Sequence, residues 1–199
     1  ARQAGENLKA MNFVPDIAFT SLLKRTIRTL WVMLEKADLV WVPVIKSWRL
    51  NERHYGDLQG KNKAEPAREY GDEQLHIWRR SFTVRPPLLD SNSQVRLSED
   101  IRYRNIDIDP GNLPRGESLE DTSRRVFPYW EAEILPRLRN GKNVLVAAHG
   151  NSLRALIKHL EQVSDEDITA VNIPTGRPKV YEFDRELLPT RRYYYGDSK

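Results

Sequence analysis

The chain has 199 residues, of which 39% are hydrophobic and 30% charged, and its formal net charge at pH 7 is +4. This composition suffices for one hydrophobic core, and a mild positive charge spread among acids does not select a partner. The chain has no cysteine, which excludes disulfides and thiolate zinc sites, and no apolar run near the ~20 residues that cross a bilayer. With no signal peptide visible at Ala1, we expect a cytoplasmic protein.

The first fifty residues predict two helices and two strands. Residues 1–10 resemble the interior of a helix, and Ile17–Ser21 is a short apolar run typical of a buried strand. Ser21–Glu35 predicts a helix because apolar residues recur at helical spacing, namely Leu23, Ile27, Leu30, Trp31 and Leu34. Val40–Ser47 is rich in Val, Ile and Trp but is interrupted by Pro43, which favours an edge strand.

The middle of the chain is irregular. No period holds over residues 48–60, so a loop dense in charged and aromatic residues is predicted there, and Pro66–Arg80 predicts helical turns broken at Gly71. Residues 84–115 contain four prolines and an Asp-Pro-Gly turn at Asp109–Gly111. We expect a long surface excursion over this stretch, and ordered loops of such length are often functional.

The second half predicts alternating helices and strands. Glu117–Arg139 is expected to be one long helix, with Ser118 as N-cap to Asp121 and a kink at Pro128. The elements after it are a central parallel strand, Val144–Ala148, a helix, Ser152–Leu160, a short helix capped by Ser164, and two closing strands, Val180–Phe183 and Arg192–Tyr195. This alternation predicts an α/β fold with a mostly parallel central sheet flanked by helices, in a single domain over residues 1–199.

A histidine ends the strand predicted at residues 144–148. His149 is followed by Gly150 and Asn151 and then by a helix, so it lies at the carboxyl end of a strand, where open α/β sheets place their sites. The free N–H groups at the start of the helix suit a phosphate, and Gly150 allows close backbone approach. The alternative is a histidine that merely finishes the strand.

A second candidate site lies in the irregular stretch. Glu52 is followed by Arg53, His54 and Tyr55, and a carboxylate beside arginines can transfer protons within an anion site. Further cations that could grip phosphate or carboxylate are Arg25, Arg28, Lys63, Arg79 and Arg80. The alternatives are a charge-paired solvated loop, surface arginines, or a nucleic-acid patch at Trp78–Arg80.

Several blocks closely resemble the cofactor-dependent phosphoglycerate mutases of the histidine phosphatase superfamily. These blocks are Thr20–Trp31, Ser47–Gly60, Asn62–Glu65, Ile77–Arg80, Ala147–Arg154, Asn172–Gly176 and Val180–Asp184. The resemblance runs from Ala1 to about Gly196, and the block at Asn51–Gly60 is specific to mutases within the superfamily. It implies an α/β fold and the interconversion of 3-phosphoglycerate and 2-phosphoglycerate through a phosphohistidine, primed by 2,3-bisphosphoglycerate and without a metal.

The resemblance also implies a role for each site residue. His149 would polarise the phosphoryl group, Glu52 would be the general acid and base on the substrate hydroxyls, and Arg25 would hold the transferring phosphoryl group. The residues implied to bind the rest of the substrate are Arg53, Tyr55, Lys63, Arg79, Arg80, Gly150 and Asn151. The implied partners are small phosphoglycerates and further copies of the chain, as a dimer or tetramer, with neither nucleic acid nor membrane.

One motif of the resembled family has no counterpart here. Family members begin with a strand that ends in Arg-His-Gly, whose histidine takes the phosphate, and that triplet does not occur in this sequence. We therefore expect a further N-terminal segment, including the first strand of the sheet, ahead of Ala1. Two alternative functions remain: a bisphosphoglycerate mutase or phosphatase, and an inactive protein that binds phosphorylated metabolites.

Overall fold

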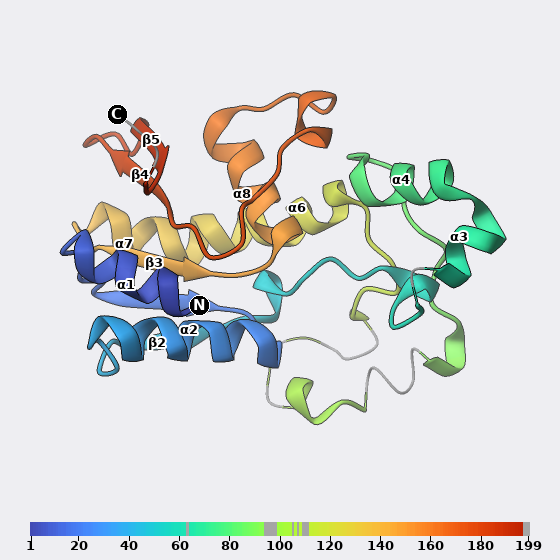
Figure 1. Ribbon diagram of the computed structural model, residues 1–199, viewed down its shortest axis with the longest axis horizontal. Helices are drawn as coiled ribbons and strands as arrows, with labels where there is room; N and C mark the ends of the chain where they lie inside the picture. Colours follow the sequence, from blue (N-terminus) through green and yellow to red (C-terminus); the bar gives the residue numbers. More distant parts are fainter. Residues whose placement is uncertain (63, 94–98, 105, 107, 109–111, 197–199) are drawn as a thin grey trace. The chain divides into compact units, whose positions relative to one another are not determined.

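The computed structural model describes residues 1–62, 64–93, 99–104, 106, 108 and 112–196. The chain forms two compact units (Figure 1). Unit 1 comprises Ala1–Asn51, Phe127–Gly150 and Asn172–Lys199, and unit 2 comprises Glu52–Val126 and Asn151–Val171. The prediction of a single domain over 1–199 stays a prediction.

Unit 1 is built on a parallel sheet of three strands among the described residues. Strands β1 (Ile17–Thr20), β2 (Val44–Lys46) and β3 (Val144–Ala147) lie in the order β2-β1-β3, and both pairings are parallel. The α/β fold with a parallel sheet is thereby confirmed, as is β2 as an edge strand. The central position predicted for residues 144–148 is wrong for these strands, because β1 has the more continuous burial and lies in the middle.

Helices cover both faces of this sheet. Helices α1 (Arg2–Ala10) and α2 (Lys24–Ala37) pack together on one face, around a core that includes Leu8, Ala18 and Leu30 (Figure 1). The next residue of β1 after Ala18 points to the opposite face, because side chains alternate along a strand. There the Phe19 ring meets the Tyr129 ring edge to face, with centroids 6.2 Å apart. Burial on both faces explains why β1 has no polar alternation.

The helix predicted over Glu117–Arg139 is divided in the structure. Helix α6 (Leu119–Tyr129) passes into a π-helical turn, η5 (Trp130–Ile134), and then into α7 (Leu135–Arg139). Pro136, near the start of α7, has no N–H to donate one turn back, so regular α-helical bonding cannot continue through it. The predicted closing strands form a separate antiparallel hairpin, β4 (Lys179–Phe183) and β5 (Pro189–Tyr194), in unit 1.

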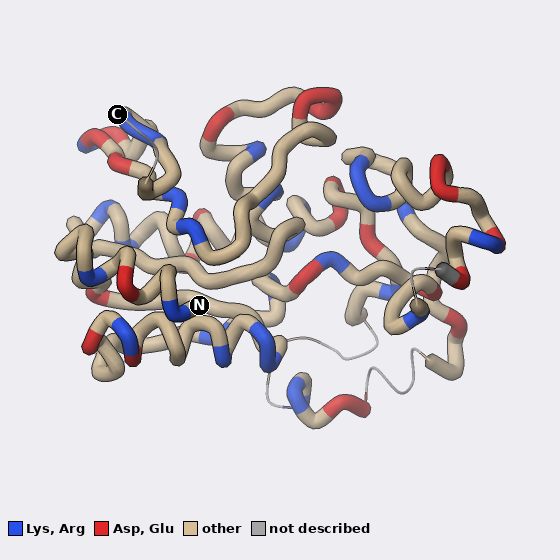
Figure 2. Tube along the Cα trace, viewed as in Figure 1, with Lys and Arg blue, Asp and Glu red and all other residues tan. Residues whose placement is uncertain are grey.

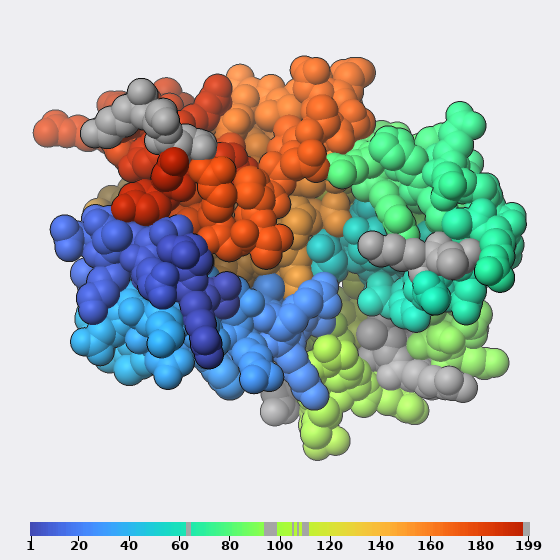
Figure 3. Space-filling view, viewed as in Figure 1, coloured from blue at the N-terminus to red at the C-terminus, as the bar shows by residue number. Residues whose placement is uncertain are grey.

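The predicted break at Gly71 is confirmed. Helix α3 (Ala64–Tyr70) ends and α4 (Asp72–Arg80) begins there, with Gly71 at φ +79°. The space-filling view places this helix pair of unit 2 at the surface (Figure 3). In the stretch over residues 84–115 the structure has a 3₁₀ turn, η3 (Ile101–Tyr103), whereas the turn at 109–111 lies outside the described residues.

Helix α8 (Gly150–Glu161) begins two residues earlier than predicted, directly after His149. Further 3₁₀ turns among the described residues are η1 (Trp48–Leu50), η2 (Gly56–Leu58) and η6 (Asp167–Thr169). Lys, Arg, Asp and Glu are interspersed along the traced chain (Figure 2).

In the described part of the chain, no group of three His, Asp or Glu side chains has the arrangement of a metal site. No helix over the described residues has the length and apolarity that a membrane crossing requires.

Candidate active site

A buried histidine in unit 1 is held by side chains from the end of β1 and the start of α2. His149 is 5% exposed, and its Nε2 lies 2.8 Å from Ser21 Oγ and 3.3 Å from Thr26 Oγ1. On the opposite side of the ring, Arg25 Nε donates to Nδ1 at 3.2 Å. Strands β1 and β3 are adjacent and parallel, so their carboxyl ends bring residues 21 and 149 together.

The hydrogen-bond partners fix the tautomer of His149. A guanidinium can only donate, so Nδ1 must accept and the ring proton must be on Nε2. Ser21 Oγ accepts a hydrogen bond from Nε2 and another from the Leu23 N–H at 3.0 Å. The Ser21 hydroxyl in turn donates to Thr26 Oγ1, whose own hydroxyl donates to the Leu23 carbonyl. The imidazole is therefore neutral in this arrangement and oriented by a chain of hydroxyl groups.

Arg25 is exposed although its Nε is bound to the buried ring. The two terminal nitrogens of its guanidinium have no partner in the part of the chain that the structure describes. A planar guanidinium with two exposed N–H₂ groups can hold a phosphate through paired hydrogen bonds. Arg25 and His149 are thus brought together, as the predicted site requires, and they can act on one oxyanion.

A carboxylate in unit 2 faces the first turn of α8. Glu52 Oε1 accepts the N–H of Arg53 at 2.8 Å and the N–H of Asn151 at 3.2 Å. The Asn151 N–H belongs to the opening turn of a helix, where amides lack partners within the helix and the dipole favours negative charge. These two donors fix the orientation of the Glu52 carboxylate, which suits a group that must transfer protons at a defined position.

The residue after Glu52 is a buried arginine. Arg53 is 1% exposed, its Nη2 donates to the Arg79 carbonyl at 3.0 Å, and its guanidinium lies over the Tyr55 ring at 4.8 Å. Among the described residues, Nε and Nη1 of Arg53 have no hydrogen-bond partner. Buried donors of a charged group are normally paired, so these unpaired donors of Arg53 point to an anionic ligand.

A pocket of about 430 Å³ adjoins these residues within unit 2. Tyr55 and Arg79 line it together with Gln59, Lys61 and Pro66. Lys61 is paired with Asp57 at 2.6 Å, whereas the predicted ligand Lys63 lies outside the described residues. The pocket therefore offers a phenol and a guanidinium to an anionic group.

The structure groups the predicted residues into two sets, one in each unit. Unit 1 holds Arg25, His149 and Gly150, and unit 2 holds the others that are described: Glu52, Arg53, Tyr55, Arg79, Arg80 and Asn151. The chain itself joins the sets, because Asn51 precedes Glu52 and Gly150 precedes Asn151. That both sets serve one reaction stays a prediction.

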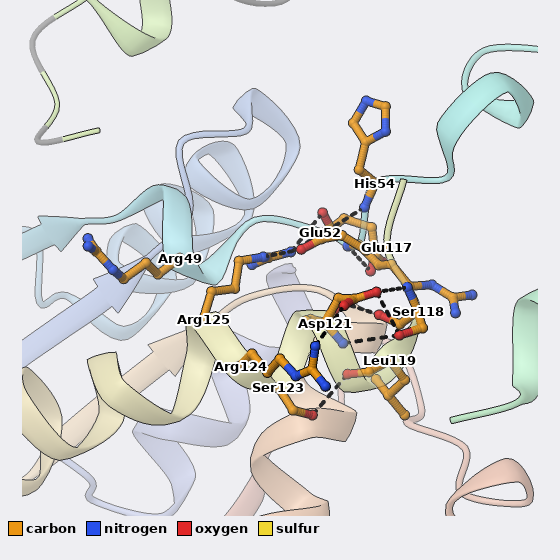
Figure 4. A network of polar contacts seen from close by, with 12 residues as sticks. Arg49, Glu52, His54, Glu117, Ser118, Leu119, Asp121, Ser123, Arg124 and Arg125 are labelled. Atoms are coloured by element: carbon orange, nitrogen blue, oxygen red, sulfur yellow. Dashed lines mark hydrogen bonds and ion pairs between the residues drawn. The ribbon is translucent and has the colours of Figure 1, made fainter. Parts of the chain in front are cut away.

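A buried ion pair that sequence reasoning missed supports the Glu52 segment (Figure 4). Arg125 donates from Nε to Glu117 Oε1 at 2.7 Å and from Nη2 to Oε2 at 2.9 Å, and the two side chains are 8% and 4% exposed. Glu117 Oε2 also accepts the His54 N–H at 2.8 Å, and the Glu117 N–H donates to the His54 carbonyl. Arg125 further donates to the Glu52 carbonyl at 3.3 Å. The pair thus holds the backbone on both sides of Arg53.

The start of α6 fixes the position of that ion pair. Ser118 and Asp121 form the predicted cap, in which Ser118 Oγ accepts the Asp121 N–H at 3.1 Å and Asp121 Oδ2 accepts the Ser118 N–H at 2.9 Å (Figure 4). Partial burial raises the pKa of Asp121, but Arg85 and Ser118 outweigh it and lower that pKa to about 2. Burial lowers the pKa of the nearby His54, whose Nδ1 accepts the Gly56 N–H at 3.1 Å.

Gly56 closes the same segment against a neighbouring loop. It has φ +59°, and a Cβ built on it would lie 1.9 Å from the Pro87 carbonyl oxygen. We expect Gly56→Ala to lower the free energy of unfolding by at least ~2 kcal/mol, because left-handed strain of ~1–2 kcal/mol adds to a backbone clash. Urea unfolding of the purified protein measures the change.

Gly60→Ala is the matched control for that substitution. Gly60 has φ +78° but no atom within 4 Å of a built Cβ, so the backbone strain alone should remain, ~1 kcal/mol. Equal losses at the two positions would show that the close approach to Pro87 is unimportant.

Comparison with known proteins adds a family and a fold. The model of the histidine phosphatase superfamily (branch 1) matches residues 1–103 and 92–193. A mycobacterial glucosyl-3-phosphoglycerate phosphatase structure is 20% identical, with 99% of this chain and 85% of that chain covered and a TM-score of 0.65. The alpha-ribazole phosphatase from Shigella flexneri is 18% identical over 96% of this chain and 79% of that one, with a TM-score of 0.62. YhfR from Bacillus stearothermophilus is 17% identical over 100% and 83%, with a TM-score of 0.65. At these identities the likeness shows the shared fold.

Proposed function

The chain belongs to the histidine phosphatase superfamily, and from this premise we propose that it takes part in the interconversion of 3-phosphoglycerate and 2-phosphoglycerate by phosphoryl transfer. The mutase-like block at Asn51–Gly60 supports this choice within the superfamily, because Glu52, Arg53 and Tyr55 all belong to it. We propose 2,3-bisphosphoglycerate as the primer that supplies a phosphoryl group when it is bound.

The observation that carries the proposal is the buried Arg53 guanidinium with unpaired donors in the unit that also holds Glu52. Arg53 is buried with two unpaired donors, and Arg79 of the same unit lines the pocket together with Tyr55. Phosphoglycerates carry a carboxylate and a phosphate, so they need several fixed cations besides the group that handles the transferring phosphoryl. The residues of unit 2 fit such a ligand in charge and in donor number.

Proton transfer is the role proposed for Glu52. When a hydroxyl oxygen of the substrate attacks a phosphohistidine, its proton passes to the Glu52 carboxylate, and the N–P bond breaks as the O–P bond forms. In the opposite half-reaction the leaving oxygen recovers a proton from Glu52. Phosphoryl transfer otherwise needs mainly positioning and charge stabilisation, which we assign to Arg25 and His149. The histidine that carries the phosphate in the resembled family belongs to the Arg-His-Gly triplet, which these 199 residues do not contain.

Phosphatase activity is the second candidate. Two of the similar structures reported above are described as phosphatases, and hydrolysis would use the same acid with water as the acceptor of the phosphoryl group. A phosphometabolite-binding protein without turnover is the third outcome.

Phosphorus NMR separates these outcomes with the protein as its gene encodes it, including any residues encoded ahead of Ala1. The sample contains 3-phosphoglycerate and a trace of 2,3-bisphosphoglycerate. We expect a 2-phosphoglycerate signal to reach equilibrium before inorganic phosphate accumulates. Release of phosphate without 2-phosphoglycerate would replace the mutase by the phosphatase, and no change in either signal would contradict both enzymes.

A further inference from the structure

Arg154 is a buried arginine of α8 that the proposed mechanism does not use. It is 5% exposed, and its Nη1 donates to Asn151 Oδ1 at 3.1 Å. Its Nη2 donates to the carbonyls of Ile168 and, at 3.4 Å, of Arg80. Over the described residues it forms no ion pair, and its Nε has no hydrogen-bond partner. The side chain therefore joins Asn151 to the carbonyl of Arg80, another predicted ligand residue.

The guanidinium of Arg154 is buried, and burial disfavours its charged form. Burial, followed by the positive charges of Arg53 and Arg80, lowers the pKa of its guanidinium to about 10, against smaller opposing contributions from Tyr55 and Glu52. The group remains protonated at neutral pH. Glu52 offsets the two neighbouring cations only in part, so an anion bound within unit 2 would further stabilise this buried charge.

The direction of the hydrogen bonds beyond Arg154 follows from its chemistry. A guanidinium can only donate, so the Asn151 side chain must turn its oxygen toward Arg154 and its N–H₂ group away. That N–H₂ group donates to Tyr55 Oη at 2.9 Å. The Tyr55 oxygen is thus an acceptor toward Asn151, and its own proton is directed elsewhere.

Tyr55 lines the pocket that also contains Arg79. The guanidinium of Arg53 lies over the Tyr55 ring at 4.8 Å, and the attraction between the cation and the ring face helps to hold the plane of the ring. A phenol proton that is not used toward Asn151 can donate to an anionic oxygen in this pocket, and such charge-assisted bonds are short and strong.

We propose that Arg154 is a positioning residue that, through the Asn151 amide, makes the Tyr55 hydroxyl a donor to an anionic oxygen of the ligand. Arg154 itself does not touch the ligand. The inference relies on the proposed function for the identity of that ligand, a phosphoglycerate, and on the contacts within unit 2 for everything else. Its distinctive consequence is that the contribution of Tyr55 to binding depends on residues 151 and 154.

A double-mutant cycle measured by isothermal titration calorimetry with 3-phosphoglycerate tests this dependence. We expect Tyr55→Phe to weaken binding ~10-fold or more, the loss typical of one hydrogen bond to a charged group. In an Arg154→Met background, where the amide is free to rotate, the same substitution should change the affinity less than ~2-fold. An undiminished effect of Tyr55→Phe in that background would overturn the proposal.

Asn151→Asp provides a second cycle if Arg154→Met fails to fold. A carboxylate at 151 accepts from both Arg154 and Tyr55, so it keeps the contacts but reverses the direction of the Tyr55 hydrogen bond. Tyr55→Phe should then have no further effect on affinity, and a persistent ~10-fold loss would again contradict the proposal. Arg154→Lys, which keeps the charge but not the planar fork, should be intermediate.

The choice of probe separates this inference from the proposed function. If the unsubstituted protein binds 3-phosphoglycerate but the cycles are additive, the role of Arg154 is wrong and the proposed substrate stands. If it binds no 3-phosphoglycerate, the proposed substrate is wrong, and the same cycles are run with inorganic phosphate. Absence of phosphate binding as well would overturn the role of Arg154, because Tyr55 would then have no anion to receive its proton.

Discussion

Replacing Glu52 by glutamine is expected to lower kcat for phosphoglycerate interconversion by ~10²–10⁴-fold, the range that a positioned general acid–base group contributes. Glutamine keeps the size of the side chain and an oxygen for the N–H groups of Arg53 and Asn151, but it cannot take up or return a proton. Steady-state kinetics measures the effect on kcat.

Glu73→Gln is the matched control for this prediction. Glu73 is an exposed residue in the first turn of α4, in the same unit, and no described contact involves its carboxylate. Its substitution removes the same charge, so it should leave kcat within ~2-fold, as for a surface change away from the site. A fully active Glu52→Gln protein would remove Glu52 from proton transfer.

The largest effect on stability is expected from the Glu117–Arg125 pair. Arg125→Met leaves the Glu117 carboxylate buried without its cation, and breaking a buried pair in this way typically costs ~3–5 kcal/mol of unfolding free energy. The Glu52 carbonyl also loses the hydrogen bond from Arg125, and Glu117, which accepts the His54 N–H, is held less firmly. We therefore expect kcat to fall as well as the free energy of unfolding. Urea denaturation gives the first quantity, and assays well below the unfolding midpoint give the second.

Two further variants test whether the loss of stability comes from the unpaired buried charge. Arg124→Met removes the adjacent, exposed arginine of α6, which pairs with Glu120 at 2.7 Å and with Asp121 at 3.7 Å, and should cost less than ~1 kcal/mol. The double variant Glu117→Gln, Arg125→Met removes both charges and should be more stable than Arg125→Met alone, because no unpaired charge stays buried. A loss for Arg125→Met no larger than for Arg124→Met would show that burial of the pair is unimportant.

The sequence predicted those parts of the fold that depend on local pattern. β1 and β3 are short apolar runs, α2 and α8 repeat apolar residues at helical spacing, and the Ser118–Asp121 cap depends on residues three apart. The sequence predicted a kink at Pro128, but α6 continues through that residue, and the π-helical turn η5 ahead of Pro136 was missed because apolar spacing does not reveal backbone bonding.

The residues that support the site were missed for a different reason. Glu117 and His54 are 63 residues apart, and Ser21 and His149 are 128 apart, so neither contact leaves a pattern in any local window. Arg154 lies between apolar residues of an amphipathic helix and has the spacing of an ordinary surface arginine. Its position three residues after Asn151, one turn along the same face, was the available signal.

The pairing of β1 with β3 has a consequence for synthesis of the chain. Thr20 and Ala147, which are 127 residues apart, form a hydrogen bond across this pair. At ~5–20 residues per second, β1 leaves the ribosome roughly 6–25 s before its partner exists. During that interval the edge of β1 that later pairs with β3 lacks this partner, and an unpaired strand edge is competent for association with other nascent chains.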